Sequence, residues 1–194
     1  MKKVLIDCGG NLGQGYDQIT TIYSDVNFDE VHIFEPNPLT FKFLLNKKFN
    51  HNVVLHQQAV YGENTTKSLT IEFDPSENVR HWVGGATNVL EEKFVKPDYI
   101  ADEYIKTNVA EITCIDLSEW LSNSFSPDDF IILKLDCEGC EYEILDKMIS
   151  DDTLKYVDQI IVEWHNHLRN DYVKSNLYYI KKFKEHGIGY TEWF

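Results

Sequence analysis

The sequence contains no long hydrophobic run. No apolar stretch approaches the roughly 20 residues that a membrane-spanning helix needs. The N-terminal apolar run is interrupted by Asp7 after three residues, so it is too short for the core of a signal peptide. We therefore expect a cytoplasmic protein that has no membrane partner.

Basic residues and cysteines are also scarce. The chain has 18 Lys and Arg against 32 Asp and Glu, a formal net charge of −14. Such a surface repels phosphate, which argues against nucleic acid as a partner. Cys137 and Cys140 have the C-x-x-C spacing of a redox or metal motif, but no second pair supplies the ligands of a zinc site. We interpret them as small, half-buried thiols around a turn.

Apolar segments of strand type alternate with amphipathic segments of helix type along the 194 residues. This alternation predicts an α/β fold, with a mostly parallel central sheet and helices on both faces. The expected strands are 3–8, 30–35, 52–60, 112–115, 130–136, 157–164 and 190–194, and the expected helices are 14–24, 38–45, 116–121, 141–149 and 172–186.

The alternation is interrupted at residues 61–111, where only 68–73 alternates like an exposed antiparallel strand. Long irregular insertions in compact domains are usually functional. We predict a β-hairpin and loop insertion after the third strand, covering the substrate side of a single domain that spans 1–194.

A glycine-rich turn follows the first expected strand, and an acid ends the second. Gly9, Gly10 and Gly13 leave room for a ligand to approach the backbone. Glu35 follows Gly13 by 22 residues, where a carboxylate can accept hydrogen bonds from both ribose hydroxyls. The loop and the acid together indicate an adenosine-containing ligand, either NAD or S-adenosylmethionine.

Two features separate these ligands. The dinucleotide fingerprint G-x-G-x-x-G does not fit any set of glycines in this loop. The carboxylate of Asp7, just before the first glycine, would repel a pyrophosphate and would suit an ammonium or sulfonium group. Both observations favour S-adenosylmethionine over NAD.

Candidate catalytic residues follow two late strands. Asp136 and Glu163 end strands that we expect to be adjacent or nearly so, and His165 has a side chain that titrates near neutral pH. These three are our candidates for acid–base chemistry. Asp136, Glu138 and Glu163 could also supply oxygen ligands to a divalent metal, but their spacing does not establish a site, and we predict no metal.

Four motifs, in this order, resemble those of the FkbM-type class I methyltransferases. Residues 7–13 resemble the family's D-x-G-x-N-x-G loop, and residues 34–38 resemble its F-E-P-x-P strand end. Residues 133–141 resemble its K-x-D-x-E-G-x-E segment. Glu163, followed by His165, stands where the family has an acid ending the next strand.

The resemblance implies a Rossmann-like methyltransferase fold, S-adenosylmethionine as cofactor, and transfer of a methyl group to a hydroxyl of a sugar, glycan or small-molecule acceptor. Many relatives carry an N-terminal helical extension that helps to close the site, so we expect the insertion or a second subunit of a homo-oligomer to close it here. The resemblance also implies which residues bind the cofactor. Asp7, Gly9, Asn11 and Gly13 would face its methionine part, and Gly10 belongs to the same binding loop. Glu35 would hold the ribose, Asn37, Gln58 and Ala59 would lie near the adenine, and Asp136 would lie beside the methyl group.

Three alternatives stay open. A methyltransferase-like scaffold would bind the cofactor without turnover, and an NAD-dependent oxidoreductase would need the pyrophosphate loop that is missing. An N- or protein methyltransferase is the third, although the N-P-P-Y signature of amine or amide methylation is absent.

Overall fold

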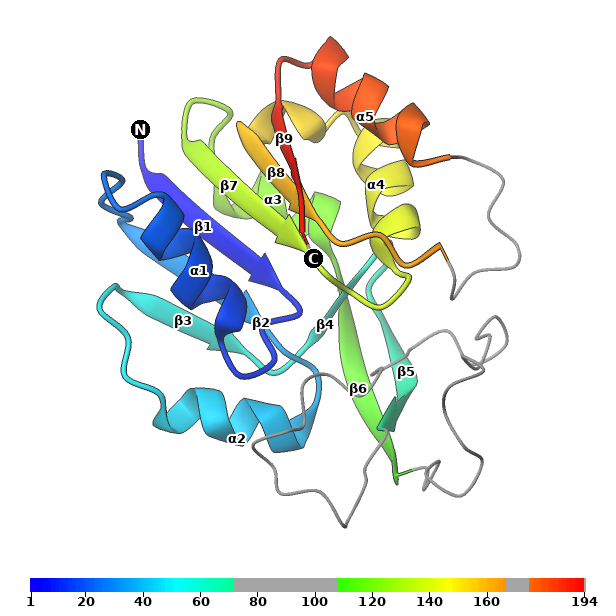
Figure 1. Cartoon of the computed structure of the whole chain (residues 1–194). Helices are drawn as coiled ribbons and strands as arrows, with labels where there is room; N and C mark the ends of the chain where they lie inside the picture. Colours follow the sequence, from blue (N-terminus) through cyan, green and yellow to red (C-terminus); the bar gives the residue numbers. More distant parts are fainter. Residues whose placement is uncertain (72–107, 167–174, 194) are drawn as a thin grey trace.

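The computed structural model describes residues 1–71, 108–166 and 175–193 (Figure 1). Its central six-stranded sheet has the order β3-β2-β1-β7-β8-β9, and every neighbouring pair in it is parallel. The strands are β1 (Lys3–Cys8), β2 (Glu30–Phe34), β3 (Val53–His56), β7 (Phe130–Leu135), β8 (Gln159–Val162) and β9 (Gly189–Glu192).

The sheet is buried on both faces, as continuous apolar runs such as those of β1 and β7 require. Helices α1 and α2 contribute Tyr16, Ile19, Phe41 and Leu44 to the core on one face, and α3, α4 and α5 cover the other. The predicted Rossmann-like arrangement is confirmed. The helices are α1 (Gln14–Ile22), α2 (Pro38–Asn46), α3 (Leu117–Ser124), α4 (Glu141–Ser150) and α5 (Asn176–Glu185), with a 3-10 turn at Leu154–Tyr156.

The single strand predicted over 52–60 is wrong, because the structure divides it. β3 pairs with β2 in the central sheet, whereas β4 (Ala59–Tyr61) pairs with β6 (Asn108–Asp116) in a second sheet of order β4-β6-β5. An apolar run indicates that a segment is buried, but it does not indicate which strand lies beside that segment. The break falls at the two glutamines between β3 and β4.

The start and the end of the predicted insertion are strands. β5 (Thr65–Ile71) pairs antiparallel with β6, from Thr65 opposite Cys114 to Ile71 opposite Asn108. The predicted antiparallel strand is therefore confirmed with an earlier start, and the strand predicted at 112–115 is longer than expected. The expectation that the insertion covers the substrate side falls on residues 72–107, which lie outside the described residues.

The C-terminal edge strand predicted at 190–194 is confirmed as β9, which pairs parallel with β8. The predicted helix 172–186 corresponds to α5, and residues 172–174 lie outside the described ranges. Among the described residues, no helix has both the length and the apolar character that a membrane span requires.

Candidate functional site

Three of the segments singled out by the sequence meet at the carboxyl edge of the central sheet. β1 lies between β2 and β7, so the residues that follow these strands are neighbours. The amides of Gly9 and Gly10 both donate to the carbonyl of Phe34 at 3.0 Å, and the amide of Asp136 donates to the carbonyl of Cys8 at 3.1 Å. Ligands of open parallel sheets bind at this edge.

The first glycine of the loop is required by packing inside the protein. Gly9 has a φ of +84°, and a Cβ at this position would collide with the backbone carbonyl oxygen of Asp136. The end of β1 thus approaches the end of β7 more closely than any side chain allows. From the sequence, the glycines were expected to leave room for a ligand. The structure shows that Gly9 also allows the two strand ends to pack together.

Asn11 and Glu35 connect the loop to the end of β2. The backbone amide of Asn11 donates to Glu35 Oε2 at 2.7 Å, and the amide of Asn37 donates to Oε1 at 2.7 Å. Burial raises the pKa of the Glu35 carboxyl, and these two amides oppose the rise. The Oδ1 atom of Asn11 is buried and accepts no hydrogen bond within the described residues, so it is an acceptor in need of a donor.

The three residues predicted to contact adenine lie on different elements of the structure. Asn37 caps α2, because its Oδ1 accepts from the amide of Leu39 at 2.9 Å. Gln58 precedes β4 and Ala59 begins it, so the expectation that they end the third strand of the central sheet is wrong. Their contact with adenine stays a prediction, and the second sheet, not the central one, positions Ala59.

Lys134 is a site residue that the sequence reasoning missed. It is only 1% exposed near the carboxyl end of β7, and its Nζ lies 3.0 Å from Asp7 Oδ1 and 3.0 Å from Asp136 Oδ2. The same Nζ donates to the carbonyl of Gly9 at 3.1 Å. A lysine inside an otherwise apolar strand is a signal that was available, since a buried ammonium needs anionic partners.

This contact gives Asp7 an internal partner. The Asp7 carboxylate is completely buried, and it lies against the first turn of α1, where a Cβ on Gly15 would come within 2.6 Å of Oδ2. Burial raises the pKa of the Asp7 carboxyl, and the Lys134 ammonium opposes the rise. Burial alone would lower the pKa of Lys134, but Asp7 and Asp136 outweigh it and raise that pKa above its usual range. Direct contact of Asp7 with a cofactor stays a prediction.

The three predicted catalytic residues are brought together by the adjacent strands β7 and β8. His165 is 5% exposed, and its Nε2 lies 4.0 Å from Asp136 Oδ1 and 3.8 Å from Glu163 Oε1. Glu138 Oε2 is nearer, at 3.5 Å from the same nitrogen. Glu141 Oε1 lies 3.0 Å from the other ring nitrogen, Nδ1. We call these five residues the His165 cluster.

Negative charge exceeds positive charge in the His165 cluster. Burial would lower the pKa of His165, but Glu141, Glu138 and Asp136 outweigh burial and raise it to about 10. Burial raises the pKa of Glu138 to about 7, despite the opposing effect of His165. Burial also raises the pKa of Glu163. Four carboxylates around one imidazole make this part of the edge a place for a cation.

Glu141 organises the turn between β7 and α4. It is completely buried, and its two oxygens accept from the amides of Cys137 at 2.6 Å and Gly139 at 3.0 Å. The turn includes Glu138 at a φ of +50° and Gly139 at +97°. Cys137 and Cys140 lie around this turn without a disulfide; Cys137 is half-buried, as the sequence predicted, whereas Cys140 is buried. The contact of Glu141 with His165 was not predicted from the sequence.

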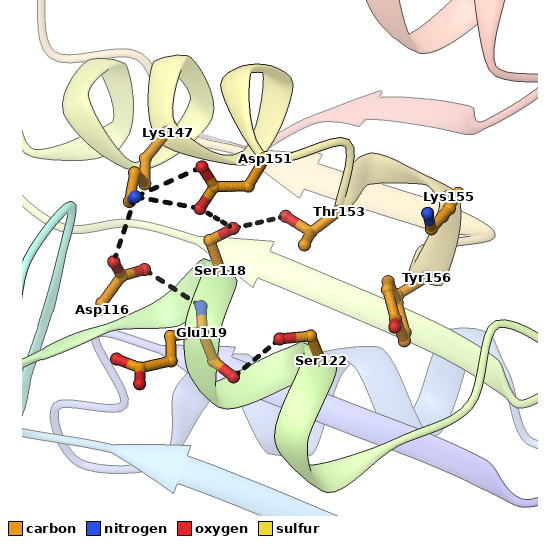
Figure 2. Close-up of a pocket in the computed structure, with 9 residues that line it drawn as sticks. All are labelled: Asp116, Ser118, Glu119, Ser122, Lys147, Asp151, Thr153, Lys155 and Tyr156. Carbon is orange, nitrogen blue, oxygen red and sulfur yellow. Dashed lines mark hydrogen bonds and ion pairs between the residues drawn. The ribbon is translucent and has the colours of Figure 1, made fainter.

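A surface pocket between α3 and α4 lies elsewhere (Figure 2). Its charges pair with each other: Lys147 Nζ lies 3.0 Å from Asp151 Oδ2 and 3.7 Å from Asp116 Oδ2. The hydroxyl of Ser118 donates to Asp151 at 2.8 Å. Lys147 and Asp151 stand at the end of α4 opposite to Glu141, so this pocket is separate from the edge that carries the candidate site.

The sequence and the structure were both compared with known proteins. A crystal structure of methyltransferase FkbM from Methylobacillus flagellatus KT is 15% identical, with a TM-score of 0.42 over 77% of this chain and 29% of that one. The chain thus spans under a third of that protein's length. No curated protein matches. The model of the methyltransferase FkbM domain matches residues 7–187, almost the whole sequence, so the chain belongs to the FkbM methyltransferase family.

Proposed function

We propose that the protein is an S-adenosylmethionine-dependent methyltransferase that methylates a hydroxyl of a sugar, glycan or small-molecule acceptor. The observation that carries the proposal is the meeting of Asn11, Glu35 and Asp136 at the ends of three adjacent parallel strands. An acceptor atom, a buried acid and a partly exposed carboxylate thereby share one edge of the sheet.

These residues fit the cofactor chemically. Each oxygen of Glu35 accepts one amide and keeps a lone pair for a ribose hydroxyl. The buried Oδ1 of Asn11 suits a donor such as the cofactor's ammonium group. Gly9 and Gly10 let the loop lie close to the sheet, and Gly13 lets it lie close to the C-terminal end of α2. Asp136 supplies negative charge that would stabilise a sulfonium.

The acceptor hydroxyl needs a residue that takes its proton. When bound, the cofactor supplies a methyl group on a positively charged sulfur and leaves as a neutral thioether, so the hydroxyl proton has to be received by the protein or by solvent. The side chain of Glu163 is 35% exposed, against 22% for Asp136 and 0% for Glu141. We assign proton removal to Glu163, since it extends furthest toward solvent, and we place Asp136 and His165 beside the reacting groups.

Calorimetry with S-adenosylmethionine and its demethylated product tests the proposal. We expect dissociation constants in the micromolar range, and about a 10- to 100-fold loss in Glu35→Gln, because a neutral amide replaces a charged acceptor. Glu185→Gln, a change at an exposed glutamate of α5, is the matched control and should bind like the wild type. The absence of any heat of binding for both ligands would contradict the proposal.

A further inference from the structure

Although the sequence alone led us to predict no metal, we propose from the geometry that Asp136, Glu138 and His165 bind a divalent cation of the Mg²⁺ and Mn²⁺ class. The proposal deepens the proposed function and rests on it for the use of the cation, but not for the binding itself. In the described part of the chain, these three residues each direct one ligand atom to a common point. Glu163 stays beside that point, free to act on the acceptor.

The distances suit a metal ion. The ligand atoms of the three residues all lie within 4.8 Å of one another, with 3.5 Å between His165 Nε2 and Glu138 Oε2 and 4.0 Å between His165 Nε2 and Asp136 Oδ1. On a cation with bonds of about 2.1–2.3 Å, neighbouring ligands are about 3 Å apart and opposite ligands about 4.5 Å apart. Small side-chain adjustments therefore bring all three atoms to bonding distance, and the cation takes the place of the proton on His165 Nε2, which is released to solvent.

The site differs from an ordinary acidic patch because it contains a buried, oriented imidazole. Glu141 Oε1 contacts His165 Nδ1, which directs Nε2 toward Asp136 and Glu138. Metal-binding histidines are characteristically held in this way, with the second ring nitrogen on a carboxylate. Glu141 is itself fixed by two backbone amides, so the ring orientation is set by the fold of the turn between β7 and α4.

The surplus of negative charge around His165 also favours a divalent cation. Lys134 lies between Asp7 and Asp136, on the opposite side of Asp136 from His165, so its charge is shared by two carboxylates. Glu138, Glu141 and Glu163 all contact the single imidazole of His165. A divalent cation would balance this surplus. Two carboxylates and one imidazole form a mainly hard donor set, which suits Mg²⁺ or Mn²⁺ better than a thiolate-seeking metal.

Titration of Mn²⁺ into the full chain, followed by electron paramagnetic resonance after removal of metals with EDTA, tests the site. We expect one bound Mn²⁺ per chain, displaced by Mg²⁺, and at least a 10-fold loss of affinity in Glu138→Gln and His165→Asn. Glu185→Gln and His186→Asn make the same chemical changes on exposed residues of α5 and its C-cap, and should bind Mn²⁺ as the wild type does. Glu138 is partly exposed, so its replacement leaves the core intact, and circular dichroism checks this for each variant.

A second variant separates a metal site from diffuse attraction of cations. Glu141→Gln replaces the charged partner of His165 Nδ1 with a neutral amide without removing a proposed ligand, and should weaken Mn²⁺ binding about 10- to 100-fold. Equal Mn²⁺ binding by wild type, Glu138→Gln and His165→Asn would overturn the proposal, as would no binding at all.

Binding of the demethylated cofactor in the presence of EDTA distinguishes this failure from failure of the proposed function. Cofactor binding without a Mn²⁺ site would overturn only the metal proposal. A Mn²⁺ site without cofactor binding would support the metal proposal and overturn the proposed function.

Discussion

Asp136 contacts two groups of charged side chains, and these groups differ in how far their positive and negative charges cancel. On one side, Lys134 is buried between Asp7 and Asp136, and one oxygen of each carboxylate lies 3.0 Å from its Nζ. On the other side, His165 faces four carboxylates at 3.0–4.0 Å, several of them partly exposed. The buried group around Lys134 joins the ends of β1 and β7. The His165 cluster has surplus negative charge and partly exposed side chains, so it is suited to bind a ligand. We therefore expect the Lys134 group to matter mainly for stability and the His165 cluster mainly for function.

Removal of Lys134 should have the largest effect on stability. Lys134→Met leaves Asp7 buried without its ammonium partner, which should lower the free energy of unfolding by about 3–5 kcal/mol. Urea unfolding measures this. Lys155→Met removes an exposed, solvent-screened ion pair with Asp152 and should leave the free energy of unfolding almost unchanged. A similar small cost for both variants would show that the Lys134 group does not hold the strand ends together.

A methyl group at Gly9 should disturb the same region. Gly9→Ala places a Cβ against the carbonyl of Asp136 at a positive φ, and should cost about 2–4 kcal/mol of stability from collision and strain combined. Gly187→Ala also has a positive φ, but its Cβ would meet no described atom within 4 Å, so it isolates the strain. Thermal unfolding of both variants checks the difference, and equal losses would contradict a packing role for Gly9.

Two glutamates of the His165 cluster should respond differently to neutralisation. Glu141→Gln weakens charge-assisted hydrogen bonds to two amides and to His165, and should cost about 1–3 kcal/mol. Glu138→Gln removes one negative charge from a surplus and should leave stability within about 0.5 kcal/mol of wild type. Urea unfolding of the two isosteric variants tests whether Glu141 has the structural role, and the reverse order would contradict it.

His56 offers a contrast with His165, since its ring stacks on Phe34 and lies 3.0 Å from His32. Burial, and then the charge of His32, lower the pKa of His56 from 6.5 to about 4. The unfolded chain therefore binds more protons between these two values, so His56 makes stability fall as the pH drops from about 6.5 to about 4. Unfolding midpoints at pH 7 and pH 5 should differ less in His56→Phe than in wild type. An unchanged pH dependence in that variant would contradict the assignment.

The sequence predicted the parts of the molecule that depend on pattern. The alternation of strands and helices gave the parallel sheet, and the carboxyl ends of its strands placed Asp136, Glu163 and His165 together. It did not predict the division of 52–60 between two sheets, because an apolar run does not identify its neighbours. The contact between Lys134 and Asp7 was missed for a related reason, since it depends on the register of two strands that are distant in the chain.

The central position of β1 has a consequence for how the protein folds. The amide of Lys2, beside β1, donates to the side chain of Asp129, 127 positions later in the sequence. β1 therefore leaves the ribosome long before β7, and it obtains its partner on one side only after β7 has been made. Contacts between such distant segments slow folding. An apolar strand waiting for its neighbour is also exposed to aggregation, so the yield of soluble protein should depend on how quickly β7 reaches β1.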